Sequence, residues 1–130
     1  MTDILCYEDS YLKEFDAEVT AVTDKGVVLD RTAFYPGGGG QPPDSGVLSF
    51  GDTKTTVKRI RRTDGEYVHE LDGEFPTVGT KIHGVLDWDR RYLLMRTHTA
   101  LHILCGVVWR DYGAQVTGGN MEPLKARMDF

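Results

Sequence analysis

The sequence predicts an α+β fold, in which a small N-terminal β-barrel is followed by one helix and one strand of a second domain. The barrel is assigned to residues 1–86 because about six short apolar runs occur there, separated by turn residues at regular spacing. Residues 87–130 are assigned to the second domain because the pattern changes at Arg90–Asp111 to one long, largely apolar run. A run of that length indicates a helix.

Two hairpins define the predicted barrel most clearly. Apolar residues alternate from Ala17 to Ala21, Asp24-Lys25-Gly26 supplies a turn, and an apolar run resumes at Val27. Asp64-Gly65 predicts a second tight turn. The expected strands are residues 17–21, 27–29, 47–50, 55–60, 67–71 and 81–86, with a further turn at 75–79. The first fifteen residues lack a clear period and are expected to form a loop or a short strand.

The predicted helix has plausible signals at both ends. Asp87 or Asp89 is expected to cap its start, and Gly113 is expected to end it. Residues 115–120 are expected to form a glycine-containing turn, and residues 125–130 are expected to open a strand. One helix and one strand cannot bury the apolar face of the helix. We therefore expect an incomplete second domain, whose exposed helix face associates in a homo-oligomer.

The charge balance is acidic, with 20 Asp or Glu against 15 Lys or Arg and a net charge of −5. This balance argues against indiscriminate binding to nucleic acid, which normally requires a basic surface. One local basic cluster consists of Lys58, Arg59, Arg61 and Arg62. It is interpreted either as a solvated strand face or as a patch that contacts RNA phosphates.

Nothing in the sequence predicts a membrane protein. The apolar run Ala100–Trp109 is interrupted by His102 and is too short to span a bilayer, and no signal peptide is recognisable. We expect a cytoplasmic location. Cys6 and Cys105 lie far apart and outside any CxxC pattern, which favours neither a disulfide scaffold nor a zinc ribbon.

Two histidines, His98 and His102, stand four residues apart within the predicted helix. This spacing places both imidazoles on one helix face, close enough to hold one metal ion. The alternative is that both histidines are buried and hydrogen-bonded without a metal. The spacing alone does not decide between these interpretations.

A second unusual stretch, RTAFYPGGGGQPPDSG, runs from Arg31 to Gly46. Its four consecutive glycines are costly in a strand or helix, and its three prolines remove backbone donors. The stretch therefore predicts a shaped loop that exposes its backbone.

Taken together, RTAFYPGGGGQPPDSG, HTALH and ARMDF resemble the AlaX family, the free-standing relatives of the editing domain of alanyl-tRNA synthetase. The resemblance implies a Gly-rich β-barrel followed by an α/β editing domain. It implies ATP-independent hydrolysis of mischarged Ser-tRNA(Ala), and in some members Gly-tRNA(Ala), in support of translation fidelity. The expected partner is mischarged tRNA(Ala), and the expected cofactor is zinc, which activates water and polarises an ester carbonyl.

The resemblance also assigns residues. His98 and His102 match the first two zinc ligands, and Thr32 matches the threonine that meets the hydroxyl of the misplaced serine. Gln41 matches the glutamine that closes the Gly-rich motif. The glycines before it, Gly39 and Gly40, would let the backbone approach the substrate closely.

Each assignment has a structural alternative: an ordinary strand residue for Thr32, a flexible loop for the glycines, and a structural role for Gln41. The later Cys and His ligands of the family, a CxxxH pattern, do not follow His102 in this chain. Cys105 is not the family's cysteine, since it lies one turn past His102 on the same predicted helix. We therefore expect the 130-residue chain to be inactive by itself. Two alternatives stay open, an internal fragment of an alanyl-tRNA synthetase and a non-catalytic tRNA-binding or interaction module.

Overall fold

The computed structural model describes residues 2–130, which form two compact units. The barrel unit contains the chain up to Pro36 and the segment Pro43–Asp87. The helix unit contains Gly37–Pro42 and Trp88–Phe130. The central part of the Gly-rich stretch therefore belongs, by its contacts, to the unit that carries the histidine pair.

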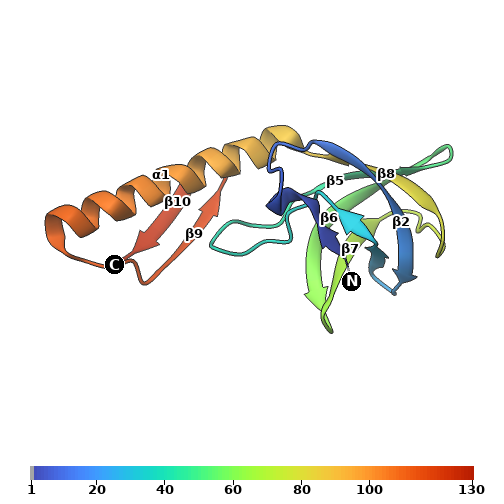
Figure 1. Ribbon diagram of the computed structural model, residues 1–130, viewed down its shortest axis with the longest axis horizontal. Helices are drawn as coiled ribbons and strands as arrows, with labels where there is room; N and C mark the ends of the chain where they lie inside the picture. The colour runs from blue at the N-terminus through green and yellow to red at the C-terminus, as the bar shows by residue number, and fades with distance from the viewer. Residues whose placement is uncertain (1) are drawn as a thin grey trace. The chain divides into compact units, whose positions relative to one another are not determined.

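A closed barrel forms the body of the barrel unit, with strand order β2-β3-β7-β6-β5-β8 (Figure 1). The strands are β2 Glu14–Val22, β3 Gly26–Leu29, β5 Gly46–Phe50, β6 Thr53–Thr63, β7 Glu66–Asp72 and β8 Lys81–Leu86. Every neighbouring pair is antiparallel. The predicted α+β class and the predicted small barrel are confirmed.

Alternation of side chains builds the barrel core. Along β2, Phe15, Ala17 and Val19 are buried, whereas the acidic residues between them are exposed. Successive side chains of a strand point to opposite faces, so this period of two places the apolar set inside. The buried cluster continues through the other strands and includes Leu29, Phe34, Leu48, Val57, Ile60, Leu71, Ile82 and Leu86.

The hairpin between β6 and β7 turns where the sequence predicts, since Asp64 and Gly65 both adopt positive φ, 53° and 80°. Positive φ at both central residues is typical of the tight turns that match strand twist. β6 is longer than predicted and carries a bulge between Val57 and Arg59. The extra residue lets Val57 and Ile60, three positions apart, both lie in the core.

The first residues of the described chain and the start of the Gly-rich stretch form a small separate pairing. β1 Asp3–Ile4 pairs in parallel with β4 Arg31–Thr32, and a short 3-10 helix, Leu5–Tyr7, follows β1. Of the two expectations for the first fifteen residues, a loop or a short strand, the structure has the short strand β1. The pairing fixes Thr32 at the start of the Gly-rich stretch.

The helix unit consists of α1 Trp88–Tyr112 and an antiparallel pair, β9 Gly118–Glu122 and β10 Lys125–Asp129, which contacts α1. The expected strand at the end of the chain is confirmed as β10. The expected turn over residues 115–120 is wrong, because residues 118–120 belong to β9. Glycine and asparagine are disfavoured in strands, and pairing with β10 outweighs that preference here.

The end of α1 follows its sequence signal. Gly113 has φ of 66°, and its N–H donates to the carbonyl oxygen of Trp109 at 2.9 Å. A glycine in the left-handed region commonly ends a helix in this way. No helix formed by residues 2–130 combines the length and the apolar character that crossing a membrane demands.

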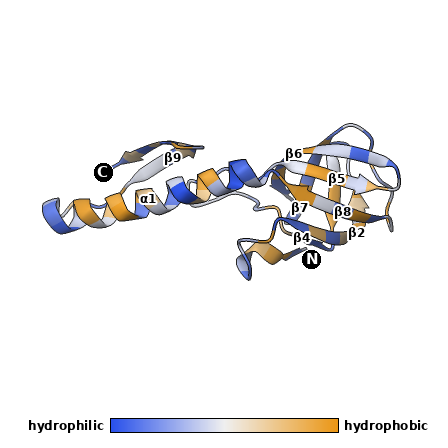
Figure 2. Ribbon diagram, turned by 90° about the horizontal axis from the view of Figure 1, so that it is seen from above, coloured by the Kyte–Doolittle hydropathy of each residue, from blue (hydrophilic) through white to orange (hydrophobic). Residues whose placement is uncertain are grey.

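Much of the apolar surface of α1 is exposed, and Figure 2 shows apolar stretches along the helix. Ile103 and Trp109 are 64% and 56% exposed, and only Arg91, Leu94 and Thr97 of this helix are buried. We expect the chain to self-associate through Ile103, Leu104 and Val107, which are exposed neighbours on the helix surface, because exposed apolar surface favours association. Sedimentation velocity should show concentration-dependent dimers that Ile103→Glu weakens. Val78→Glu, which changes an equally exposed residue of the barrel unit, is the control. A strictly monomeric wild type at high concentration would count against this expectation.

Candidate functional site

The two histidines of the HTALH motif face each other on α1. Their ring centroids are 4.9 Å apart with an interplanar angle of 25°, and the two Nε2 atoms are 3.2 Å apart. The i, i+4 spacing produces this stacking, because residues four apart are neighbours on a helix surface. The pair is partly exposed rather than sealed in a core.

Gln41 holds the other side of His98. The Nδ1 of His98 lies 3.0 Å from the Oε1 of Gln41, whose residue is 7% exposed. An amide oxygen only accepts hydrogen bonds, so Nδ1 carries the proton and Nε2 of His98 keeps a lone pair. In the absence of a metal, that lone pair is free to accept a hydrogen bond from Nε2 of His102, which lies 3.2 Å away. Gln41 thus selects the tautomer of His98 in which Nε2 is the available ligand atom.

Burial lowers the pKa of His98 below its ordinary value of 6.5, and the neighbouring His102 lowers the pKa further. Both effects disfavour the charged imidazolium. His98 is therefore neutral at neutral pH, and neutral imidazole is the form that binds metals.

The Gly-rich loop lies against this pair. All four glycines from Gly37 to Gly40 have positive φ, and Gly38 and Gln41 exchange two backbone hydrogen bonds of 3.1 Å. A Cβ added at Gly39 would lie 3.7 Å from the Cε1 of His98. The expectation that this stretch is a shaped loop, neither strand nor helix, is confirmed. Other residues would be strained in the same backbone.

A cavity of about 380 Å³ adjoins the histidines within the helix unit. It is lined by His98, His102, Gly39 and Gly40, together with Cys105, Leu101 and residues of β9 and β10. The predicted residues Gly39, Gly40, Gln41, His98 and His102 are therefore brought together in one place. The cavity offers room for a small group beside the two imidazoles.

The geometry of the pair fits two ligands of a zinc ion. Two Zn–N bonds of about 2.0–2.1 Å at a tetrahedral angle place the nitrogens roughly 3.3 Å apart. The observed Nε2–Nε2 distance is 3.2 Å. However, no group of three or more His, Cys, Asp or Glu side chains around one metal position exists within residues 2–130. Catalytic zinc normally has three protein ligands, so the described residues supply only part of such a set.

Thr32 lies in the barrel unit, not in the unit that contains the histidine pair. Its side chain is fully buried, and its Oγ1 lies 2.9 Å from Nε2 of His69 and 3.1 Å from the backbone nitrogen of Phe34. The role of Thr32 in substrate recognition stays a prediction. The structure adds that its hydroxyl already has two partners within the barrel.

His69 of β7 was not singled out by the sequence. It stands within a strand and carries no motif, so only its complete burial reveals it. Burial lowers the pKa of His69 from 6.5 to about 4, although backbone contacts with Val27 and Tyr67 oppose this shift. A neutral, buried histidine in a barrel core requires hydrogen-bond partners, and His69 has them.

The depressed pKa of His69 predicts acid sensitivity of the barrel. Between about pH 6.5 and pH 4 the unfolded chain binds the proton and the folded chain does not, so stability falls as pH decreases. The full effect is about 3 kcal/mol. Denaturant unfolding of wild type and His69→Gln at pH 7, 5 and 4 should show a shallower pH dependence in the variant. His83→Gln, at a half-exposed histidine, is the control. Equal pH dependence in wild type and His69→Gln would contradict the assignment.

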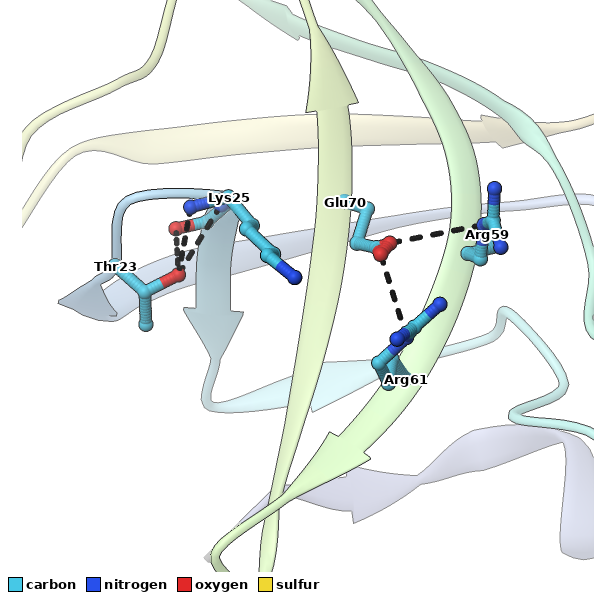
Figure 3. A network of polar contacts seen from close by, with 6 residues as sticks. Thr23, Lys25, Arg59, Arg61 and Glu70 are labelled. Atoms are coloured by element: carbon cyan, nitrogen blue, oxygen red, sulfur yellow. Dashed lines mark hydrogen bonds and ion pairs between the residues drawn. The ribbon is translucent and has the colours of Figure 1, made fainter.

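The three arginines of the basic cluster on β6 contact neighbouring side chains. Arg59 and Arg61 lie 3.6 Å and 3.4 Å from the carboxylate of Glu70, and Figure 3 shows both ion pairs. Arg62 lies over the ring of Tyr67 at 5.6 Å. These contacts favour the interpretation of a strand face over that of a phosphate-binding patch.

Residues 5–90 match the sequence profile of the family described as tRNA synthetases class II (A). The chain belongs to this family. The Alanyl-tRNA editing protein AlaX-M of Methanosarcina barkeri is 45% identical over 137 residues, which cover 100% of this chain and 56% of that protein. The AlaX-M of Saccharolobus solfataricus is 43% identical, with the same coverage of 100% and 56%.

The Alanine–tRNA ligase of Ignicoccus hospitalis is 44% identical over 97% of this chain and 14% of the ligase. The expected resemblance to AlaX proteins is therefore confirmed. The chain spans 56% of the length of the two editing proteins.

Proposed function

We propose that this chain contributes the Gly-rich barrel and part of the metal site of an aminoacyl-tRNA deacylase that hydrolyses mischarged Ser-tRNA(Ala). The observation that carries the proposal is the His98–His102 pair, held by Gln41 beneath the Gly-rich loop, in a chain 45% identical to an alanyl-tRNA editing protein. Gly-tRNA(Ala) is a second proposed substrate. The proposed location is the cytoplasm, where mischarged tRNA(Ala) is the partner.

In this proposal, residues 1–86 form the Gly-rich barrel domain, and residues 87–130 form the first part of the editing domain. His98 and His102 would hold zinc through their Nε2 atoms, together with ligands outside the described residues. When bound, zinc would supply Lewis-acid activation of water and of the ester carbonyl. Gln41 keeps His98 in the tautomer that exposes Nε2, and the loop glycines bring backbone close to the cavity.

The role given to Gln41 predicts that zinc affinity falls when its side-chain amide is removed. Gln41→Leu keeps an uncharged side chain and removes the acceptor for Nδ1 of His98, so zinc affinity should fall about 10–100-fold, as for other outer-shell partners. A competition titration with a chromophoric chelator measures this. Gln115→Leu, at an exposed position of the same unit, should leave affinity unchanged. Equal affinities of Gln41→Leu and wild type would remove Gln41 from the site.

The function is tested in an extended protein, in which this chain is joined to the remaining C-terminal part of the Methanosarcina barkeri relative. The extended protein should release serine from Ser-tRNA(Ala) and leave Ala-tRNA(Ala) intact. The 130-residue chain alone should release little serine. If the extended protein hydrolysed neither substrate, the proposal would fail.

A second candidate is that the chain is a segment of an alanine–tRNA ligase, which its 44% identity to such a ligase favours. The chemistry at the histidine pair would be the same. The two candidates differ in what adjoins the chain, so the sequence of the complete gene separates them. A non-catalytic tRNA-binding module would instead bind tRNA(Ala) without hydrolysis in the same assay.

A further inference from the structure

His69 connects three segments of the barrel unit through its ring. It lies on β7, its Nδ1 is 3.2 Å from the carbonyl oxygen of Val27 on β3, and its Nε2 is 2.9 Å from Oγ1 of Thr32 on β4. The ring of Phe34 meets it edge-on, with centroids 5.7 Å apart. His69 and Thr32 are both fully buried, so water does not compete for these bonds.

The partners of His69 fix its tautomer. A backbone carbonyl oxygen only accepts hydrogen bonds, so Nδ1 must carry the proton that is donated to Val27. Burial holds the pKa of His69 at about 4, so the ring is neutral near pH 7 and its Nε2 has no proton. Nε2 is therefore an acceptor, and the hydroxyl of Thr32 must donate to it.

The hydroxyl of Thr32 then has only one hydrogen-bonding position left. A threonine hydroxyl has one hydrogen to donate and two lone pairs that accept. Its hydrogen goes to His69, and the backbone N–H of Phe34 donates to one lone pair. One lone pair remains, so any further partner of Thr32 has to be a hydrogen-bond donor.

We infer that His69 is a positioning residue that makes the Thr32 hydroxyl an acceptor only, so that Thr32 selects a ligand carrying a hydroxyl donor. The inference rests on the proposed function for its ligand, the side-chain hydroxyl of a misplaced serine. Alanine and glycine carry no such donor. Because Thr32 is fully buried, a ligand hydroxyl reaches it only by displacing the side chains that cover it.

The direction of the hydrogen bond between Thr32 and His69 is tested first in the 130-residue chain. Long-range ¹H–¹⁵N NMR at pH 7 should show His69 protonated at Nδ1 and unprotonated at Nε2, and the Thr32 hydroxyl proton should exchange slowly. Thr32→Val should shift the Nε2 resonance of His69 without changing its tautomer, and the resonances of the half-exposed His83 should not move. Protonation of His69 at Nε2 would overturn the inference. The tautomer is measured on the wild-type chain, so this test does not depend on the folding of any variant.

The predicted preference for a ligand with a hydroxyl group is tested in the extended protein. His69→Gln, which offers Thr32 either a donor or an acceptor, should lower kcat/KM for Ser-tRNA(Ala) about tenfold more than for Gly-tRNA(Ala). His83→Gln should change neither value. If both substrates lost activity equally, His69 would serve folding alone, and the positioning role would be overturned.

The two proposals fail separately. If the wild-type extended protein hydrolysed no aminoacyl-tRNA, the proposed function would fail, and the serine ligand would be withdrawn with it. If wild type were active and His69→Gln kept the same preference for serine over glycine, this inference would fail alone.

Discussion

Replacing His98 or His102 with alanine is expected to weaken zinc binding by the extended protein more than about a hundredfold, beyond the loss that an outer-shell partner causes. Each substitution removes a proposed ligand atom, and the 3.2 Å between the two Nε2 atoms suits a tetrahedral ion. Competition titration with a chromophoric chelator measures the affinity. Thr99→Ala, at an exposed position between the two histidines, should bind zinc as wild type does.

Zinc binding by the 130-residue chain alone tests the same claim. Because its described residues bring no third ligand to the pair, zinc should bind it weakly and below one equivalent. One tightly held equivalent in a monomer of this chain would show that the set of ligands is already sufficient. Unchanged zinc affinity in His98→Ala would show that the pair is only a hydrogen-bonded stack.

Thr32→Val should lower kcat/KM of the extended protein for Ser-tRNA(Ala) about ten- to hundredfold, which corresponds to about 1–3 kcal/mol. Valine keeps the volume of threonine and loses the acceptor that a serine hydroxyl would use. Gly-tRNA(Ala) should be affected much less, because glycine has no hydroxyl to lose a partner. Hydrolysis of the two substrates under matched conditions measures the difference.

Thr32→Val should also lower the stability of the barrel. Valine leaves Nε2 of His69 and the N–H of Phe34 without their hydrogen bonds to Oγ1. The free energy of unfolding should therefore fall by about 1–3 kcal/mol for each group left unsatisfied. Activity must therefore be measured well below the unfolding midpoint. Thr32→Ser keeps the hydroxyl and should retain serine selectivity. Equal losses on both substrates would assign Thr32 to the fold or to the ribose.

Local signals predicted most of the barrel. β8 begins and ends where alternation in residues 81–86 placed it, and the turn at Asp64-Gly65 formed because both residues tolerate positive φ. α1 extends slightly beyond its predicted ends, with its histidines on one face. Such features depend on neighbours in sequence, which a periodic pattern records.

Contacts between distant residues could not be predicted in the same way. Gln41 and His98 are 57 positions apart, and Thr32 and His69 are 37 apart. No period links such pairs, so the sequence marked Gln41 and Thr32 only through family resemblance and missed His69. β9 was missed for a different reason, since its glycines and Asn120 carry turn propensity and only pairing with β10 makes them a strand.

The most direct test of the account compares serine release from Ser-tRNA(Ala) by the extended protein and by its His98→Ala variant. Both proteins should fold alike, because His98 is only partly buried on a helix surface. The account predicts rapid release by wild type and loss of nearly all activity in the variant, with Ala-tRNA(Ala) untouched by both. Release by His98→Ala at the wild-type rate would contradict the claim that the histidine pair belongs to the hydrolytic site.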